Sequence, residues 1–164
     1  MLLETDNLIV KNAVLSDAEF LATIQTNPIV QKHIGGVLGS FDDTLTSFKN
    51  QPITISNFYI VRLKSENIPI GVVSFLENSY LNDHEILIAF MPDYCGKNYG
   101  SETLATVKDY WLNKNGVNHL FATVTPENTT SISMLKKEGF KFIKEYKEDF
   151  SPLQQVYKYQ RNCI

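Results

Sequence analysis

The sequence predicts an α+β fold: a mixed, mostly antiparallel central sheet of about six or seven strands flanked by helices. Three observations support this prediction. A chain of 164 residues, 43% of them hydrophobic, is long enough to bury one core, so a single domain over 1–164 is expected. The middle of the chain alternates apolar runs with polar turns, as a β-meander does. Helical patterns lie before and after it, one of them opened by a glycine-bearing loop.

The first half of the chain is predicted to hold one strand followed by three helices. Ser16 and Glu19 have the spacing of a capping box, which would open the first helix with Ser16 as its N-cap. Pro28 suits the first position of the second helix. The expected elements are a strand at 8–11, a helix with Phe20, Leu21 and Ile24 on its apolar face, a helix at 27–34, a loop with Gly35, Gly36 and Gly39, and a helix at about 41–50.

The second half is predicted to alternate strands with two helices. Gly116 and Gly139 are expected to end those helices, because glycine is favoured just after a helix C-terminus. The expected elements are strands at 58–63, 70–76 and 84–91, a helix at 102–114 with Leu104, Val107 and Trp111 on one face, a strand at 119–125, a helix at 128–138, and strands at 140–146 and 156–159.

Composition narrows the class of protein. A net charge of −3 without a basic stripe argues against a nucleic-acid partner. No apolar run approaches the roughly 20 residues of a membrane span, and no signal-peptide pattern opens the chain. Cys95 and Cys163 form neither a disulfide framework nor a metal site. We therefore expect a cytoplasmic protein without a metal.

The stretch 92–101 is the strongest local signal. It follows an apolar strand and opens a helix, so loop N–H groups and the helix N-terminus point at one place, where they can bind an anion. Gly96 and Gly100 allow positive φ or close approach of a ligand, and Lys97 can pair with a phosphate. The loop matches neither a Walker loop nor Gly-x-Gly-x-x-Gly. These residues leave open both a phosphate or pyrophosphate ligand and a plain strand-to-helix turn.

The order of elements and four local stretches resemble the GNAT superfamily of acyl-CoA-dependent N-acetyltransferases. The similarity looks closest to the branch of ribosomal-protein N-terminal (Rim-type) acetyltransferases. The four stretches are Glu4-Thr5-Asp6-Asn7-Leu8, the strand that starts at Glu85, the loop Cys95-Gly96-Lys97-Asn98-Tyr99-Gly100, and Pro126-Glu127-Asn128-x-x-Ser131 followed by Gly139-Phe140.

The resemblance implies that acetyl-CoA is the cofactor and that the loop holds its pyrophosphate. It also implies that strand N–H groups near 89–91 bind the thioester carbonyl. Cys95 stands where the family usually has Arg or Gln, and we expect the anion-binding loop to lower its thiol pKa. Asn98 replaces a motif glycine, although Asn tolerates left-handed φ. The implied cofactor-binding residues are Phe90, Met91, Cys95, Gly96, Lys97, Asn98, Tyr99, Gly100, Ser101 and Asn128.

Glu85 and Ser131 are the candidate catalytic residues. Glu85 lies on one face of an apolar strand, where desolvation would make its carboxylate a stronger base. The alternative is a structural Glu that pairs with a lysine or orients a water. By analogy Ser131 protonates the leaving thiolate; otherwise it is a solvated helix serine. Relatives often carry a Tyr where this chain has Leu135, so Ser131, water or no acid at all must serve. Asn128 is expected to cap a helix, to contact the cofactor, or both.

Among the remaining candidates, His33 and Tyr80 lie in segments that, by analogy, shape the acceptor pocket. His84 adjoins Glu85, but neighbours on a strand point to opposite faces, so a catalytic dyad is not expected. His119 is expected at the surface.

The prediction for function is acetyl transfer from acetyl-CoA to a primary amine in a ternary complex, by a monomer or homodimer. The acceptor would be a protein N-terminus or a small amine, and the net negative charge slightly favours a cationic one. The alternative is a non-catalytic acyl-CoA-binding module, which the departures Cys95, Asn98 and Leu135 suggest.

Overall fold

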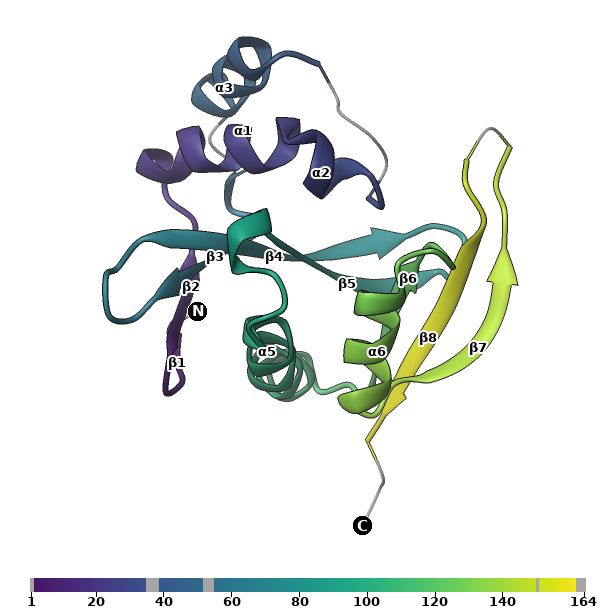
Figure 1. Cartoon of the computed structure of the whole chain (residues 1–164). Coiled ribbons are helices and arrows are strands. Elements are labelled where there is room, and N and C mark those ends of the chain that lie inside the picture. Colours follow the sequence, from purple (N-terminus) through teal and green to yellow (C-terminus); the bar gives the residue numbers. More distant parts are fainter. Residues whose placement is uncertain (1, 35–38, 52–54, 150, 162–164) are drawn as a thin grey trace.

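The computed structural model describes residues 2–34, 39–51, 55–149 and 151–161, which form one eight-stranded sheet with helices on both faces (Figure 1). The predicted α+β class is confirmed. The strands are β1 (Leu2–Glu4), β2 (Leu8–Asn12), β3 (Phe58–Leu63), β4 (Pro69–Asn78), β5 (Asp83–Phe90), β6 (His119–Val124), β7 (Lys141–Tyr146) and β8 (Gln154–Gln160). The helices are α1 (Ala18–Thr26), α2 (Pro28–Gln31), α3 (Phe41–Asn50), α5 (Tyr99–Asn115) and α6 (Thr129–Lys137), with 3₁₀ turns η1 (Leu15–Asp17) and η2 (Pro92–Tyr94).

The sheet is antiparallel except at its centre. The strand order is β1-β2-β3-β4-β5-β6-β8-β7, and β5 pairs with β6 in the parallel direction. A parallel pair needs a long crossover connection, and α5 supplies it. Helices α1, α2 and α3 cover one face of the sheet, while α5 and α6 cover the other (Figure 1). The two faces of β5 therefore look toward different helical layers.

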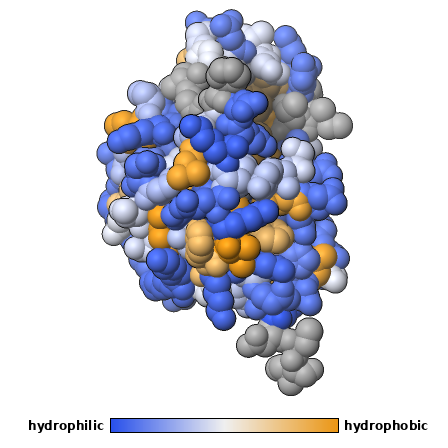
Figure 2. Space-filling model, turned by 90° about the vertical axis from the view of Figure 1, so that its right-hand side faces the viewer, coloured by the Kyte–Doolittle hydropathy of each residue, from blue (hydrophilic) through white to orange (hydrophobic). Residues whose placement is uncertain are grey.

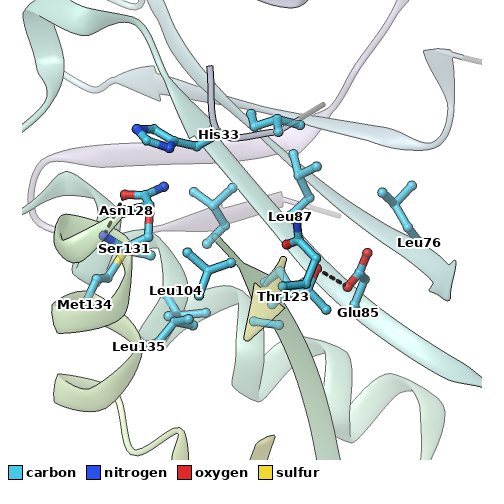
Figure 3. A pocket seen from close by; sticks show the side chains of 16 residues that line it. His33, Leu76, Glu85, Leu87, Leu104, Thr123, Asn128, Ser131, Met134 and Leu135 are labelled. Carbon is cyan, nitrogen blue, oxygen red and sulfur yellow. Dashed lines mark hydrogen bonds between the residues drawn. The ribbon is translucent and has the colours of Figure 1, made fainter. Parts of the chain in front are cut away.

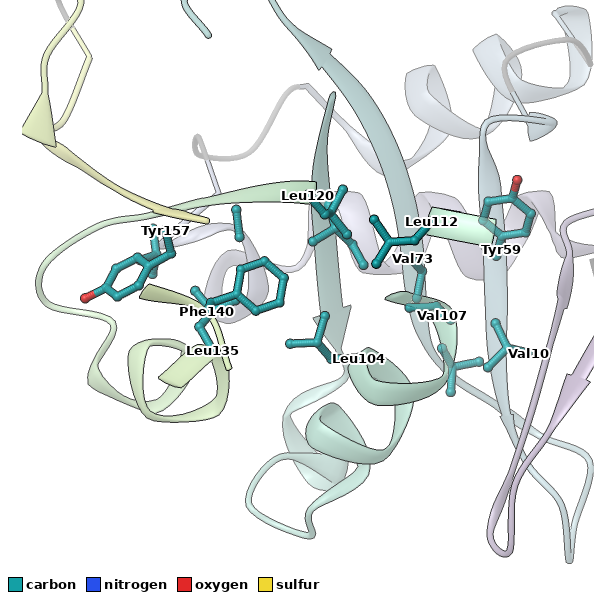
Figure 4. Close-up of a cluster of buried hydrophobic side chains, with 14 of the residues drawn as sticks. Val10, Tyr59, Val73, Leu104, Val107, Leu112, Leu120, Leu135, Phe140 and Tyr157 are labelled. Atoms are coloured by element: carbon teal, nitrogen blue, oxygen red, sulfur yellow. The ribbon is translucent and has the colours of Figure 1, made fainter. Parts of the chain in front are cut away.

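Each face of the sheet buries its own core. The core under α5 and α6, part of which Figure 4 shows, includes Val73, Leu104, Val107, Leu120 and Phe140. The core under α1 and α3 is built from Ala18, Leu21, Ala22, Ile24, Phe48, Ile55, Ile60, Val72 and Ala89, with Ala13 beside them. Strand β5 contributes to both cores: Ile86, Ile88 and Phe90 pack toward α5, and Leu87, Ala89 and Met91 toward α1. This alternation follows from the two-residue repeat of side chains along a strand.

The two edges of the sheet are protected differently. β1 has only three residues, too few for an alternating pattern to predict the strand. β7 exposes Phe142 and Ile143, each 50% accessible, but charged residues flank them along the strand. On the side of the molecule where β7 and β8 lie, hydrophobic residues are interspersed among hydrophilic ones (Figure 2). Short strands and charged side chains both discourage edge-to-edge pairing.

The predicted helix ends at glycine are confirmed. Gly116 has φ of 64° and caps α5. Gly139 has φ of 86°, and its N–H donates to the Lys136 carbonyl at 3.1 Å while the Phe140 N–H donates to the Leu135 carbonyl at 2.9 Å. This pair of bonds is a Schellman motif, which turns the chain from α6 directly into β7.

The start of the first helix differs from the prediction. Ser16 is exposed and lies inside η1, and α1 begins at Ala18 without a side-chain cap. Its neighbour Asp17, which is only 2% exposed, holds this end of the helix instead. The Asp17 carboxylate accepts the Val14 N–H at 3.0 Å and pairs with the Arg62 guanidinium at 2.6 Å. An ion pair with β3 thus fixes the start of α1, and local sequence could not reveal a partner 45 residues away.

Other local predictions need smaller changes. Asn27 caps α2 and Pro28 opens it, as expected, but the helix ends at Gln31 rather than at residue 34. The predicted loop glycines Gly35 and Gly36, like Cys163, lie outside the described residues. Within the described ranges, no helix combines the length and apolar character that crossing a membrane requires.

The ion pair gives the first testable prediction. Asp17→Ala leaves the Arg62 guanidinium largely buried without its partner, so it should lower the free energy of unfolding by about 3 kcal/mol or more. Ser16→Ala is the matched control and should change it by no more than about 0.5 kcal/mol, because Ser16 caps nothing. Urea denaturation of both variants measures the difference. If the two variants lower the free energy of unfolding equally, the prediction that Ser16 caps the helix is correct after all.

Candidate active site

The loop between β5 and α5 presents backbone N–H groups at the start of a long helix. Gly96 and Asn98 both have left-handed backbones, with φ of 75° and 66°. Helix α5 begins at Tyr99 rather than near residue 102, so Tyr99, Gly100 and Ser101 form its first turn. Their N–H groups have no partner within the helix, and the Asn98 side chain does not cap them. They can therefore hold an anion, which the helix dipole also favours.

A groove of about 370 Å³ runs between this loop and α6. Six of the predicted cofactor-binding residues line it, namely Phe90, Cys95, Gly96, Asn98, Gly100 and Ser101. Helix α6 supplies the opposite wall with Thr130, Ser131, Ser133, Met134 and Lys137. The structure thus brings together the loop and the helix that follows the stretch Pro126-Glu127-Asn128, although the two are far apart in the sequence.

Four predicted cofactor residues, Met91, Lys97, Tyr99 and Asn128, do not line the groove. The Met91 N–H donates to the Ile70 carbonyl at 2.9 Å, so it is not one of the free strand donors that we expected. Its side chain packs with the core under α1. The exposed Lys97 ammonium lies 5.3 Å from the centre of the Tyr94 ring. Tyr99 packs against the other core, and only its backbone belongs to the anion-binding turn.

The expectation for Cys95 is wrong. Burial raises the pKa of its thiol above the ordinary value, whereas we expected the loop to lower it. The Cys95 Sγ lies 3.7 Å from the Met91 carbonyl oxygen, to which its proton can be donated. The thiol therefore faces a carbonyl rather than the free N–H groups of the loop, and desolvation disfavours the thiolate.

Lys137 is a site residue that the sequence did not single out. Its ammonium donates to Asn98 Oδ1 at 2.7 Å and lines the groove beside the loop. Lysines are common in the last turn of a helix, where they complement the dipole, so the pattern alone gave no reason to choose this one. The contact holds the left-handed Asn98 in place and brings a positive charge to a loop that lacks the usual Arg.

A second pocket opens where β5 and β6 separate. The two strands share a single register position, Glu85 opposite Phe121, and are not paired beyond it. The pocket has a volume of about 280 Å³. Since the Met91 N–H points toward β4, alternation directs the N–H groups of Ile88 and Phe90 toward the side where β6 has diverged. The two strands therefore separate beside Ile88 and Phe90, close to the positions 89–91 where the family resemblance implied strand donors.

Glu85 lies in this pocket beside Thr123 (Figure 3), and two donors hold its carboxylate. The Thr123 hydroxyl of β6 donates to Glu85 Oε2 at 2.7 Å, and Asn78 Nδ2 of β4 donates to the same atom at 3.2 Å. No lysine or arginine among the described residues forms a salt bridge with it. The alternative of a strand-end Glu paired with a lysine is thus not what the structure shows.

Asn128 and Ser131 lie across the pocket from Glu85 (Figure 3). The Asn128 side chain accepts the Ser131 N–H at 3.2 Å, so its role as the N-cap of α6 is confirmed. The Ser131 hydroxyl makes no hydrogen bond with the described part of the chain, and the residue lines both the pocket and the groove. Leu135 is 4% exposed and adds an apolar wall where relatives carry a phenol.

The two predicted acceptor residues are placed differently. His33 lines the pocket, and its Nδ1 lies 3.1 Å from the Thr125 hydroxyl at the end of β6. Tyr80 does not line the pocket; it stacks on Tyr146 with ring centres 4.0 Å apart. Asn78 connects this stack to the site, because its Nδ2 also lies 3.4 Å from the Tyr146 hydroxyl.

The other histidines remain outside the pocket. His84 lies near Trp111, with ring centres 5.6 Å apart, on the face opposite to that of Glu85. His119 forms a partly exposed ion pair with Asp83 at 2.7 Å. Neither can relay a proton to Glu85. Among the described residues, no cluster of metal-binding side chains is present.

These features define a class of protein. A phosphate-binding loop, an opening between two central strands and a carboxylate at that opening suit an enzyme that joins a phosphate-bearing acyl donor to an acceptor. The acetyltransferase (GNAT) domain model matches residues 7–141 of the chain. The chain belongs to the GNAT acetyltransferase family and is an acyltransferase that uses acetyl-CoA, which sets aside the alternative of a non-catalytic binding module.

Individual relatives agree with this assignment. The chain is 26% identical over 142 residues to the uncharacterized N-acetyltransferase YnaD of Bacillus subtilis, with 86% of this chain and 83% of that protein covered. It superposes on a GNAT-family acetyltransferase from Bacillus anthracis with a TM-score of 0.82 and 25% identity, over 98% of each chain.

Two further structures share the fold at lower identity. Spermidine N-acetyltransferase from Vibrio cholerae, in complex with CoA and spermine, gives a TM-score of 0.80 at 18% identity, covering 96% of this chain and 97% of that one. RimL, a ribosomal L7/L12 α-N-protein acetyltransferase in complex with coenzyme A, gives 0.81 at 13% identity over 98% of each chain. Both structures therefore share the fold of this chain.

The N-terminal motif has a structural role beside the loop. The Glu102 carboxylate, in the first turns of α5, accepts hydrogen bonds from the Thr5 hydroxyl, the Asn7 N–H and Asn7 Nδ2. The turn between β1 and β2 is thereby tied to the helix that carries the anion-binding N–H groups. Partial burial raises the pKa of Glu102, but the hydrogen bonds from Thr5 and Asn7 outweigh burial, so the pKa is lowered overall.

This clamp should be pH-dependent. Since folding lowers the pKa of Glu102, its stabilising effect is complete above the ordinary pKa of 4.5 and is lost as the pH falls through the lowered folded-state value. Glu102→Gln should therefore reduce the midpoint of urea unfolding at about pH 7, and the difference from the wild type should shrink at about pH 3. The exposed Glu66→Gln is the control and should show little difference at either pH. A Glu102→Gln effect of equal size at both pH values would contradict the clamp.

Proposed function

We propose that this enzyme transfers the acetyl group of acetyl-CoA directly to a primary amine that binds beside Glu85. The observation that supports this proposal is continuity between the two sites. The pocket at Glu85 and the groove at the phosphate-binding loop share Ile88, Ser131 and Met134. A donor that lies in the groove thus ends at the pocket, next to the one carboxylate among the described residues that line it.

The described residues fit coenzyme A despite the departures from the family motif. The N–H groups of 96–101 bind the pyrophosphate, and Asn98 supplies the left-handed turn that a glycine usually provides. Lys137 contributes the positive charge that Cys95 does not. Bound acetyl-CoA supplies a thioester, whose acetyl carbon the amine attacks. Asn128 positions α6 against the groove through its N-cap.

Glu85 acts as the general base. An amine with a pKa near that of lysine is almost entirely protonated at neutral pH, so it must lose a proton before it can attack. The Glu85 carboxylate takes this proton directly or through one water. Thr123 and Asn78 hold the carboxylate in position for it.

The remaining steps use groups from β5 and from α6. The N–H groups of Ile88 and Phe90 polarise the thioester carbonyl, as an oxyanion hole does. The Ser131 hydroxyl, or a water beside it, returns a proton to the leaving thiolate. Leu135 cannot do so because it carries no exchangeable proton.

The acceptor is a protein N-terminus or a small amine, the two kinds named for the RimL and spermidine acetyltransferase relatives. His33 lines the acceptor side of the pocket, and Tyr80 shapes its margin through Tyr146 and Asn78. We further propose that residues 1–164 act as one domain in the cytoplasm, as a monomer or homodimer, without nucleic acid, membrane or metal.

The cofactor site can be tested at Lys137. Lys137→Met removes a charged hydrogen-bond donor from the groove and releases Asn98, so the Kd for coenzyme A should rise about tenfold. Lys136→Met is the matched control, because Lys136 is exposed on the same helix turn and does not line the groove. Isothermal titration calorimetry measures both. The loss should be the same with dephospho-coenzyme A, which keeps the pyrophosphate; equal affinities for the two variants would refute the role of Lys137.

The base can be tested at Glu85. Glu85→Gln should lower kcat by roughly 10²-fold or more, with little change in cofactor affinity, and the pH–rate profile should lose its acidic limb. Glu77→Gln, the same change on the opposite face of the adjacent β4, should leave turnover unchanged. A donor with a better leaving thiol reveals the base step if thiolate release limits the wild type. Full activity of Glu85→Gln with both donors would exclude Glu85 as the base.

A further inference from the structure

A third cavity adjoins the pocket at Glu85 on the α1 side of the sheet. It has a volume of about 150 Å³ and shares Ile34, Leu76 and Leu87 with that pocket. Its other walls come from α1, α2 and strands β3 to β5: Ile24, Gln25, Gln31, Phe58, Val72, Ser74 and Ala89. We call it the side cavity.

The side cavity is apolar and uncharged. None of the described residues that line it is Asp, Glu, Lys, Arg or His. Two of its three polar side chains already donate to backbone carbonyls: Gln31 Nε2 to Ile24 at 3.2 Å, and Ser74 Oγ to Asn57 at 2.9 Å. Burying an ammonium in such a place is strongly unfavourable, whereas burying an alkyl or aromatic group is favourable.

The side cavity lies close enough to Glu85 for a substituent of an amine bound at the carboxylate to enter it. Glu85 and Leu87 are on the same face of β5, two residues apart, which separates them by about 7 Å along the strand. Leu76 stands directly opposite Glu85 on β4. An amine whose nitrogen meets the Glu85 carboxylate can thus extend past Leu76 and Leu87 into the cavity.

We infer that the acceptor is a primary amine that carries an apolar substituent, which the side cavity holds while Glu85 takes the proton. This inference rests on the proposed function and narrows it. The side cavity selects against di- and polyamines, whose second ammonium would enter it without a carboxylate to pair with. The substituent can belong to the first residue of a polypeptide or to a small alkyl or aryl amine.

Pentylamine and putrescine form a matched pair for the test, since they differ only by a terminal methyl group in place of an ammonium. The kcat/KM of the wild-type enzyme with acetyl-CoA, read as free thiol release, should be at least about tenfold higher for pentylamine. Two peptides that differ only in Leu or Lys as the first residue should show the same preference for Leu. Whether the Leu peptide or pentylamine reacts faster then identifies a polypeptide or a small amine as the source.

A substitution in the cavity wall should reverse the preference. Gln25→Glu keeps the size of the side chain and places a carboxylate in the wall, so putrescine should gain and pentylamine should lose kcat/KM. Gln160→Glu, at the far exposed end of β8, is the matched control and should leave the ratio unchanged.

The outcomes separate the two proposals. Acetylation that favours putrescine in the wild type, or a ratio that Gln25→Glu does not alter, overturns the apolar acceptor while the acetyltransferase proposal stands. If none of the amines and peptides in the panel causes thiol release, both proposals are overturned. If Gln25→Glu does not fold, the wild-type ratio alone decides the question.

Discussion

The active site depends on the limited pairing between β5 and β6. The two strands meet at one register position, Glu85 opposite Phe121, and are not paired beyond it. A sheet that continued to pair would bury every N–H at its centre and leave no opening. Since the strands separate, the groove at the loop and the pocket at Glu85 adjoin and share Ile88, Ser131 and Met134.

Strand β5 contributes to the groove at the loop and to the pocket at Glu85 because its side chains alternate between its two faces. The face that carries Ile88 and Phe90 looks toward α5 and α6, which bring the anion-binding N–H groups and the wall of the groove. The face that carries Glu85 and Leu87 looks toward α1 and α2. The two faces of one strand therefore contribute to the groove at the loop and to the side cavity.

The loop keeps its turn and its uncapped backbone donors despite its departures from the family motif. Asn98 adopts the left-handed conformation that a glycine would otherwise supply. Its side chain is occupied by Lys137 rather than by the helix N-terminus, which leaves the first N–H groups of α5 free. Partial burial raises the pKa of the Cys95 thiol, although the residue as a whole is exposed. The Lys137 ammonium on α6 adds a positive charge beside the loop.

The sequence by itself predicted most of the strands and helices and the glycine helix ends, because these depend on local conformation and on side-chain periodicity. The second cofactor stretch, 126–131, came from the family resemblance alone. The tertiary structure alone decided which distant groups meet. Asp17 with Arg62, Glu85 with Thr123, and Lys137 with Asn98 each join elements far apart in the chain. Their signals in the sequence are single polar residues, which many surface positions share. These contacts form only when the sheet and helices pack, and the apolar side cavity likewise exists only between packed elements.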